Sequence, residues 1–269
     1  MTEPDARDRL PRFAGRSAFG SDAIGYDAGR IGYPDPLFEA VFARVPERPR
    51  ILEIGAGTGL ATRELLARDP VELVVVEPDA ALVRYLSEQF EDPRLTLVNS
   101  TFPDDHVAGP FDLIACAAAF HWMEPVAALA RIRRLLRPGG VWAVWWNSYR
   151  NPGHGDAFAQ AVTPILAGVA LPPSEGRDGH YSLDVTLQTR TLETAGLVAA
   201  RHEIYRRERT LRADEMCALY ASYSYVRALP QDERSALLDR IGDMVERDFA
   251  GAAPNVVLTA LYTARTVER

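Results

Sequence analysis

The stretch ILEIGAGTGL, residues 51–60, decides the fold. Apolar residues surround Glu53, and Gly55, Gly57 and Gly59 follow almost at once. A buried strand that ends in a glycine-rich turn and leads into a helix allows a ligand to approach the backbone, because the first N–H groups of the helix point toward it. The stretch therefore predicts a strand, a ligand-binding turn and a helix.

Hydrophobic periodicity extends this alternation along the chain. Apolar runs predict strands at 50–54, 72–77, 94–100, 111–116 and 141–147, and helical spacing predicts helices at 34–45, 60–69, 78–90 and 124–140. In the last of these helices, Val126, Leu129, Ile132 and Leu136 share one face, and a Pro-Gly-Gly sequence ends it. Strands and helices that alternate in this way favour a parallel sheet with helices on both faces.

Composition excludes several classes of protein. The chain has 269 residues, of which 47% are hydrophobic and 25% charged, as in an ordinary globular protein. Its 30 basic and 37 acidic residues give a net charge of −7, which disfavours a nucleic-acid partner. Two cysteines, no apolar run long enough for a membrane span and a polar start predict a cytoplasmic protein. The histidines and cysteines are far apart in the sequence, so no metal site is predicted.

The spacing of the glycines argues against a dinucleotide. A dinucleotide fingerprint needs its third glycine three positions after the second, and Leu60 stands there. Glu77 closes the second predicted strand, where an acid can accept hydrogen bonds from the two hydroxyls of a ribose.

With these motifs the sequence resembles the class I S-adenosylmethionine-dependent methyltransferases, in the small-molecule branch around trans-aconitate and ubiquinone-type methyltransferases. The resemblance runs from about Tyr26 to Asn147 and depends on YDAGRIGYP, ILEIGAGTG, VVVEPD, FDLIACAAAFHWM and LLRPGGVWAVWWN. It implies a Rossmann-like, doubly wound sheet of seven strands whose last strand is antiparallel, with helical insertions that form a substrate lid. It also implies S-adenosyl-L-methionine as the cofactor.

The resemblance implies a cofactor site at the ends of the strands. Glu53 and the glycine turn lie against the methionine part, and Glu77 holds the ribose. We expect the carboxylate of Glu53 to bond either to the N–H groups of the turn or to the cationic end of the cofactor. The third strand often ends in Asp or Ser beside the adenine, and VNSTF occupies that place here. The predicted cofactor-binding residues are Tyr26, Arg30, Glu53, Gly55, Ala56, Gly57, Gly59, Glu77, Pro78, Ser100, Thr101, Phe102 and Ala117.

His121 is the predicted catalytic residue. It follows the fourth strand, at the sheet edge that the fold places beside the cofactor, where it can act as a general base. Two alternatives remain: His121 lines the pocket of a substrate that needs no base, or it supports the loop together with Trp122. The predicted substrate-pocket residues are Tyr33, His121, Trp122, Trp146, Asn147 and Tyr223. Strand alternation sends Trp145 and Trp146 to opposite faces, so at most one faces the pocket.

The implied organisation has three parts. Residues 1–33 form a flexible N-terminal lid segment, in which Arg30 meets the carboxylate of the cofactor or of a substrate acid. Residues 34–147 form the cofactor-binding core. Residues 148–269 complete the sheet, with insertions at about 148–185 and 212–250 that select the substrate.

The sequence therefore predicts a methyltransferase that acts on an oxygen or nitrogen of a small metabolite, such as a carboxylic acid or a secondary-metabolite intermediate. It predicts a monomer or homodimer without a membrane or nucleic-acid partner. Two alternatives stay open: a protein of this fold that binds the cofactor but performs other chemistry, such as a cyclisation, and an accessory protein without turnover.

Overall fold

The computed structural model describes residues 30–103, 106–149, 151, 156–170, 175–176 and 179–268. Its elements in chain order are α2 Asp35–Phe42, β1 Arg50–Ile54, α3 Leu60–Leu66, β2 Glu72–Glu77, α4 Ala80–Gln89, β3 Leu95–Asn99, β4 Phe111–Ala117, η3 Phe120–Trp122, α5 Pro125–Leu135, β5 Leu136–Ser148, α6 Ala157–Val162, β6 Glu175–Gly176, β7 Gly179–His180, η5 Tyr181–Leu183, α7 Val185–Thr194, β8 Val198–Arg212, α8 Ala213–Ala221, α9 Ser224–Arg227, α10 Gln231–Asp248 and β9 Ala252–Arg265. Among the helices described, none has the length and apolar character needed to cross a bilayer.

Seven strands form one sheet in the order β3-β2-β1-β4-β5-β9-β8. β1 pairs in parallel with β2 and β4, so that Glu53 stands opposite Val75 on one side and Ala115 on the other. β3 is parallel to β2, and β5 is parallel to β4. The turns that follow β1, β2 and β4 therefore meet at one edge of the sheet.

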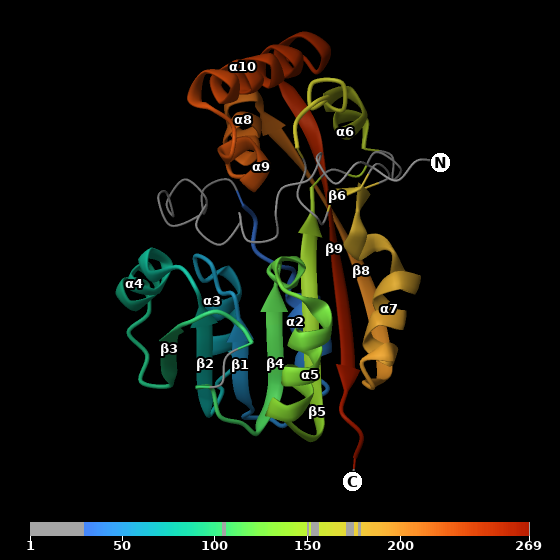
Figure 1. The fold of residues 1–269 in the computed structure, drawn as a ribbon. Coiled ribbons are helices and arrows are strands. Elements are labelled where there is room, and N and C mark those ends of the chain that lie inside the picture. The colour runs from blue at the N-terminus through green and yellow to red at the C-terminus, as the bar shows by residue number, and fades with distance from the viewer. Residues whose placement is uncertain are drawn as a thin grey trace. The chain divides into compact units, whose positions relative to one another are not determined.

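The last strand, β9, runs opposite to β5 (Figure 1). Thr266 donates from its backbone N–H to the carbonyl of Gly140 at the start of β5, at 3.0 Å. Thr259, seven residues earlier, donates from its hydroxyl to Oδ1 of Asn147 at the other end of β5, at 2.6 Å. The predicted seven-stranded, Rossmann-like sheet with an antiparallel last strand is thus confirmed.

The chain divides into two compact units. The sheet unit comprises Gly32–Asn147, Asp184–Tyr205 and Thr259–Arg269. The helical unit comprises Met1–Ile31, Ser148–Leu183 and Arg206–Leu258. Because β5, β8 and β9 each contain a boundary between the units, neither unit is a continuous piece of chain.

Each unit has its own hydrophobic core. In the sheet unit, α2, α3 and α4 bury apolar side chains against the sheet, among them Leu37, Leu65 and Leu86. In the helical unit, α10 contributes Leu237, Ile241, Met244 and Val245, which lie on one face at helical spacing. These buried faces hold the helices in place, since a helix is stabilised mainly by the packing of its apolar stripe.

One helix is shorter than its sequence predicts. α5 ends at Leu135, and the five residues from Leu136 to Gly140 belong to β5. The register between β4 and β5 shifts there, from Phe111 opposite Leu136 to Leu113 opposite Val141, so the segment bulges. Val126, placed on the buried face by its spacing, is 77% exposed.

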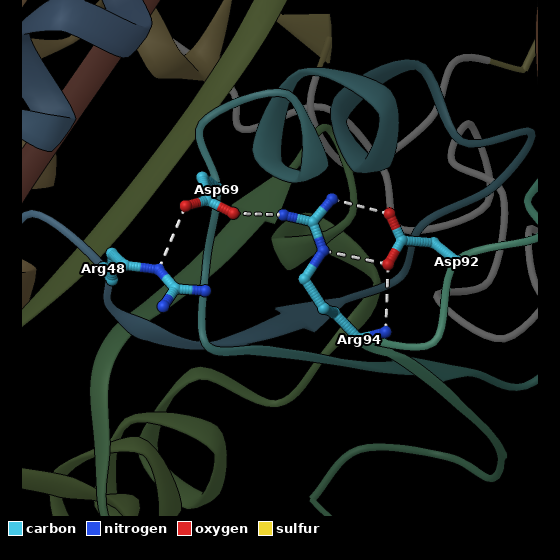
Figure 2. Close-up of polar contacts among 4 residues, drawn as sticks. All are labelled: Arg48, Asp69, Asp92 and Arg94. Atoms are coloured by element: carbon cyan, nitrogen blue, oxygen red, sulfur yellow. Dashed lines mark hydrogen bonds and ion pairs between the residues drawn. The ribbon is translucent and has the colours of Figure 1, made fainter.

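Charged residues connect the loops beside the starts of β1 and β3 (Figure 2). Arg48 contacts Asp69 at 3.0 Å, Asp69 contacts Arg94 at 2.7 Å, and Arg94 also contacts Asp92 at 2.6 Å. Hydrogen bonds from Arg94 lower the pKa of Asp92 to about 2. Because these pairs are partly or largely exposed to solvent, each adds little to stability.

Candidate cofactor and substrate site

The glycine turn joins β1 to α3, and each of its three glycines has a positive φ. At Gly55, a Cβ would lie 2.6 Å from the Cβ of Ala119, and at Gly59 it would lie 2.6 Å from the ring of Phe90. At Gly57, a Cβ would meet no protein atom within 4 Å. Two of the glycines are therefore required by packing within the protein, whereas Gly57 presents bare backbone to open space.

Glu53 lies in the middle of the sheet, fully buried beneath this turn. Its Oε2 accepts a hydrogen bond of 2.7 Å from the hydroxyl of Thr62 in α3, while its Oε1 is buried without a hydrogen-bond partner. The pKa of Glu53 is raised to about 7, mainly by burial; the hydrogen bond from Thr62 lowers it and the nearby charge of Glu77 raises it. One of the two predicted partners of Glu53 is the set of N–H groups in the turn. In the structure the Glu53 carboxylate bonds instead to the hydroxyl of Thr62.

Glu77 ends β2 beside the same turn. Its Oε2 accepts from the backbone N–H of Gly57 at 3.0 Å, and its Oε1 accepts from that of Asp79 at 3.1 Å. Burial raises the pKa of Glu77, and the two backbone hydrogen bonds oppose this. The carboxylate is thus held in a fixed orientation next to the bare backbone of Gly57.

Asn99 is a residue of this region that the sequence analysis missed. It stands opposite Glu77 in the β2–β3 register, and its amide donates to the carbonyls of Glu77 and Pro78 at 3.0 and 3.1 Å. Its place at the end of a strand, directly before the predicted adenine segment, is the signal that could have found it. Of that segment, Phe102 is buried and Thr101 is exposed.

These features fit the predicted cofactor. Its methionine end carries an ammonium group, and Glu53 offers a buried carboxylate oxygen that has no partner. Its ribose carries two hydroxyl donors, for which Glu77 offers a carboxylate oriented by backbone N–H groups. The open space at Gly57 leaves room for a ligand to lie directly on the backbone.

His121 lies in η3, just after β4. Its Nδ1 accepts a hydrogen bond of 3.3 Å from the indole N–H of Trp146 in β5. Phe120 anchors the turn by packing against Trp142, with ring centroids 5.6 Å apart. Since an indole only donates, the lone pair of Nδ1 is engaged and the neutral imidazole carries its proton on Nε2. In this tautomer the Nε2 of His121 is a hydrogen-bond donor and not an acceptor.

The residues predicted to line the substrate pocket lie on both faces of β5. Trp145 packs among Phe38 and Tyr33, each with its ring centroid 5.8 Å away, whereas Trp146 contacts His121. The side-chain amide of Asn147 donates a hydrogen bond of 3.3 Å to the carbonyl of Gly32, which belongs to the same unit. The rings of Trp122 and His121 are tilted by 45° to each other, with centroids 4.6 Å apart. Roles for Tyr33, Trp122, Trp146 and Asn147 in substrate binding stay predictions.

Arg30 is predicted to bind the cofactor and Tyr223 to line the substrate pocket. In the structure these two residues contact each other within the helical unit. The guanidinium carbon of Arg30 lies 4.6 Å from the ring centroid of Tyr223 and 4.9 Å from that of Tyr149. Tyr26 and nearly all of the predicted lid segment lie outside the described residues.

Comparison with known proteins finds similarity to methyltransferases. Residues 52–142 match the family model described as a methyltransferase domain. An uncharacterized methyltransferase of Mycobacterium tuberculosis is 29% identical over 244 residues, covering 88% of this chain and 89% of that protein. A malonyl-[acyl-carrier protein] O-methyltransferase of Magnetococcus marinus is 36% identical over 106 residues, which are 37% of this chain and 38% of that protein.

Solved structures share the fold. A putative type II methyltransferase from Anaeromyxobacter dehalogenans has a TM-score of 0.61 at 20% identity, over 89% of this chain and 99% of that chain. A phosphoethanolamine N-methyltransferase 2 from Haemonchus contortus, in complex with S-adenosyl-L-methionine, has a TM-score of 0.56 at 14% identity, over 95% of this chain and 59% of that chain. The matched domain, the methyltransferase-named relative and the shared fold together support a class I methyltransferase with S-adenosylmethionine as its cofactor.

Proposed function

We propose that this enzyme methylates a carboxylate oxygen of a small metabolite. The observation that carries the proposal is the hydrogen bond from Trp146 to Nδ1 of His121. The cofactor supplies a methyl group on a positively charged sulfur. An alcohol or ammonium acceptor must lose a proton during the reaction, but a carboxylate is already ionised at neutral pH.

His121 suits an acceptor of that kind. With its Nδ1 lone pair engaged, it offers the Nε2–H, which can hold a carboxylate oxygen but cannot take a proton from an acceptor. The transfer forms one oxygen–carbon bond and breaks one carbon–sulfur bond, and no proton has to move. The enzyme then contributes mainly by alignment of the reacting groups.

The similarity to the malonyl-[acyl-carrier protein] O-methyltransferase supports the proposal, because its name states transfer to an oxygen of an acid-bearing group. Glu53, the glycine turn and Glu77 hold the cofactor in this proposal. Trp122 and Trp146 line the acceptor side together with His121.

The test uses the full chain, methyl-labelled S-adenosylmethionine and a panel of small acids, amines and alcohols. We expect label in acids only, in a product that mild alkali hydrolyses with release of methanol, as a methyl ester requires. Label that survives alkali in an amine product would establish N-methylation instead. Cofactor binding without any labelled product from the panel or from a metabolite extract would favour the non-methylating alternatives.

A further inference from the structure

The strand β8 is the outermost strand of the seven-stranded sheet. It lies beside β9 on one side, and no other described strand pairs with its outer edge. Residues 198–205 belong to the sheet unit, and residues 201–204 within them are all exposed. The outer edge of such a strand carries backbone N–H and C=O groups that can pair with a further strand. β8 therefore offers a place for a second chain.

Side chains alternate between the two faces of β8. The hydroxyl of Tyr205 lies 2.6 Å from Oε2 of Glu203 and 3.2 Å from a backbone carbonyl of α2, so both side chains are on the α2 face. Arg201 shares that face, because it stands two residues before Glu203. His202 lies on the opposite face, where its ring stacks on that of Tyr262 with centroids 6.2 Å apart.

Positive charge gathers on the α2 face of β8. Arg44 donates to the carbonyl of Ala199, two residues before Arg201, at 3.0 Å. Arg265 donates to the carbonyl of Arg44 at 2.7 Å. Burial and the charges of Arg201 and Arg265 lower the pKa of Arg44 to about 10. Within the described ranges, no carboxylate lies at ion-pair distance from any of these three arginines, so a carboxylate supplied at Arg201 would relieve their repulsion.

Two antiparallel copies of β8 supply such a carboxylate in one register. A two-fold axis normal to the sheet maps each face of the strand onto the same face of its copy, so each residue pairs with one on its own face. When the axis passes through His202, Arg201 of each copy stands directly opposite Glu203 of the other. Ala200 likewise stands opposite Ile204. Directly opposite side chains have Cβ atoms about 5 Å apart, within reach of an ion pair.

Neighbouring registers oppose like charges. An axis at Arg201 or at Glu203 sets that residue against itself. An axis at either of the next two positions sets Arg201 against Arg207 or against Arg209. Like charges directly opposite each other destabilise a strand pair. Among axes placed at residues 201–205, only the one at His202 pairs opposite charges without also pairing like charges.

We propose that two copies of this chain associate through the outer edges of their β8 strands, antiparallel and with the two-fold axis at His202. Each copy then supplies the carboxylate of Glu203 to Arg201 of the other. Ile204, which is 45% exposed, is covered by Ala200 of the second copy. Because one pair of short strand segments buries little surface, the dimer is weak and depends on concentration and on salt. This association is independent of which acceptor the enzyme methylates.

Sedimentation of the full chain over a range of concentrations tests this dimer by exchange of charges. Arg201→Glu sets two pairs of glutamates against each other, and Glu203→Arg sets two pairs of arginines. We expect each variant alone to raise the dissociation constant at least about tenfold. An equimolar mixture of the two should restore association, because every facing pair is then Glu with Arg. Glu208→Arg is the matched control: it makes the same charge change as Glu203→Arg on the same strand, outside the paired segment, and should leave the constant unchanged.

Cross-linking tests the position of the axis. In this register His202→Cys brings two thiols directly opposite each other, with Cα atoms at a separation that a disulfide bridges. Ile204→Cys lies on the same face of the strand, but its two thiols are roughly 13 Å apart along the strand direction. Mild oxidation with copper phenanthroline should therefore link the first variant and neither the second nor the wild type. Mass spectrometry identifies the linked peptide.

A chain that stays monomeric up to about 1 mM would overturn the proposal. So would a dimer with the same dissociation constant in Arg201→Glu, Glu203→Arg and Glu208→Arg, or a mixture that associates no better than its components. If a charge variant does not fold, the cysteine variants decide, since residues 202 and 204 are exposed. Linkage that is equally efficient in both cysteine variants, or absent from both, would overturn the proposal equally.

Discussion

The indole N–H of Trp146 donates to Nδ1 of His121 across 3.3 Å, from the end of β5 to the turn after β4. Two residues that are 25 positions apart in the sequence thereby determine which nitrogen of the imidazole carries the proton. Of the roles that the sequence leaves open for His121, this contact supports the proposed pocket-lining role over that of a base.

The first prediction separates these roles by substitution. The side-chain amide of His121→Gln places an N–H donor near the position of Nε2, whereas His121→Ala removes the donor. We expect turnover to fall less than about tenfold in the first variant and about 10- to 100-fold in the second. The rate of the wild type should not follow a histidine titration near pH 6.5. A rate that rises through that pH, and that His121→Gln abolishes, would restore the base.

The second prediction concerns pH and Glu53. Its pKa of about 7 in the folded protein exceeds that of the unfolded chain, so the folded state binds the proton more tightly. The contribution of this group to the free energy of unfolding is therefore greatest below about pH 4.5, falls as the pH rises to about 7, and is constant above. Glu53→Gln keeps an acceptor for Thr62 without the charge, and should stabilise the apo protein by roughly 2–4 kcal/mol at pH 8.

Denaturant titrations of wild type and Glu53→Gln at pH 5 and pH 8 measure this difference. We expect the advantage of the variant to shrink at pH 5. Thr62→Val is the control, because it removes the hydroxyl that bonds to Glu53 and should destabilise the protein at both pH values. An advantage of Glu53→Gln that does not depend on pH would show that Glu53 does not titrate in this range.

The third prediction is that cofactor binding releases a proton from the carboxyl group of Glu53. If the ammonium of the cofactor binds at Oε1, it favours the charged form, so binding at pH 6 should release a proton from Glu53. Calorimetry with S-adenosylhomocysteine in two buffers of different ionisation enthalpy counts the protons released. Glu53→Gln should abolish the release. The same release in both proteins would assign the proton to another group.

The fourth prediction uses the unequal surroundings of the glycines. The Cβ added by Gly57→Ala would meet no protein atom within 4 Å, so the strain of a positive φ should be its only effect on the fold and should cost roughly 1–2 kcal/mol of stability. Because this Cβ would point into the space proposed for the cofactor, we also expect the affinity for S-adenosylhomocysteine to fall more than tenfold. Gly59→Ala brings a Cβ within 2.6 Å of the Phe90 ring and should lower the melting temperature further. Normal affinity in folded Gly57→Ala would remove the turn from the binding site.

The fifth prediction concerns Glu77. Loss of its carboxylate removes the acceptor for two ribose hydroxyls, and Glu77→Ala should weaken S-adenosylhomocysteine by roughly 2–4 kcal/mol. Asp79→Ala is the comparison, since the Asp79 side chain only accepts from the backbone N–H of Ala81 at the start of α4. It should affect stability more than affinity. Calorimetry showing equal affinity in wild type and Glu77→Ala would exclude Glu77 from the site.

Much of the fold could be predicted from the sequence because its signals are local. The strand, turn and helix of residues 51–66 depend on apolar runs and glycines, and these positions have the predicted structure. The end of α5 could not be found in this way, because Leu136 pairs with Phe111 of β4, and β5 begins there with a bulge before Val141. Local helical spacing carries no information about such pairing.

The same limit applies to the site. Chemistry-bearing residues such as Glu53, Glu77 and His121 could be named from their place at strand ends, but their partners could not. Thr62 reaches Glu53 from a helix, and Trp146 reaches His121 from another strand. Which side chain satisfies a buried polar atom depends on side-chain directions in three dimensions, and a linear pattern does not give these.

The crossing of β5, β8 and β9 from one unit to the other bears on how such a protein can exchange parts with its relatives. The boundaries follow Asn147, Tyr205 and Leu258, all within strands. A chimaera that takes the helical unit from another parent must exchange residues 1–31, 148–183 and 206–258 together and keep the strand register at the three junctions that lie within strands. A single crossover therefore gives a protein in which each unit is a mixture of both parents.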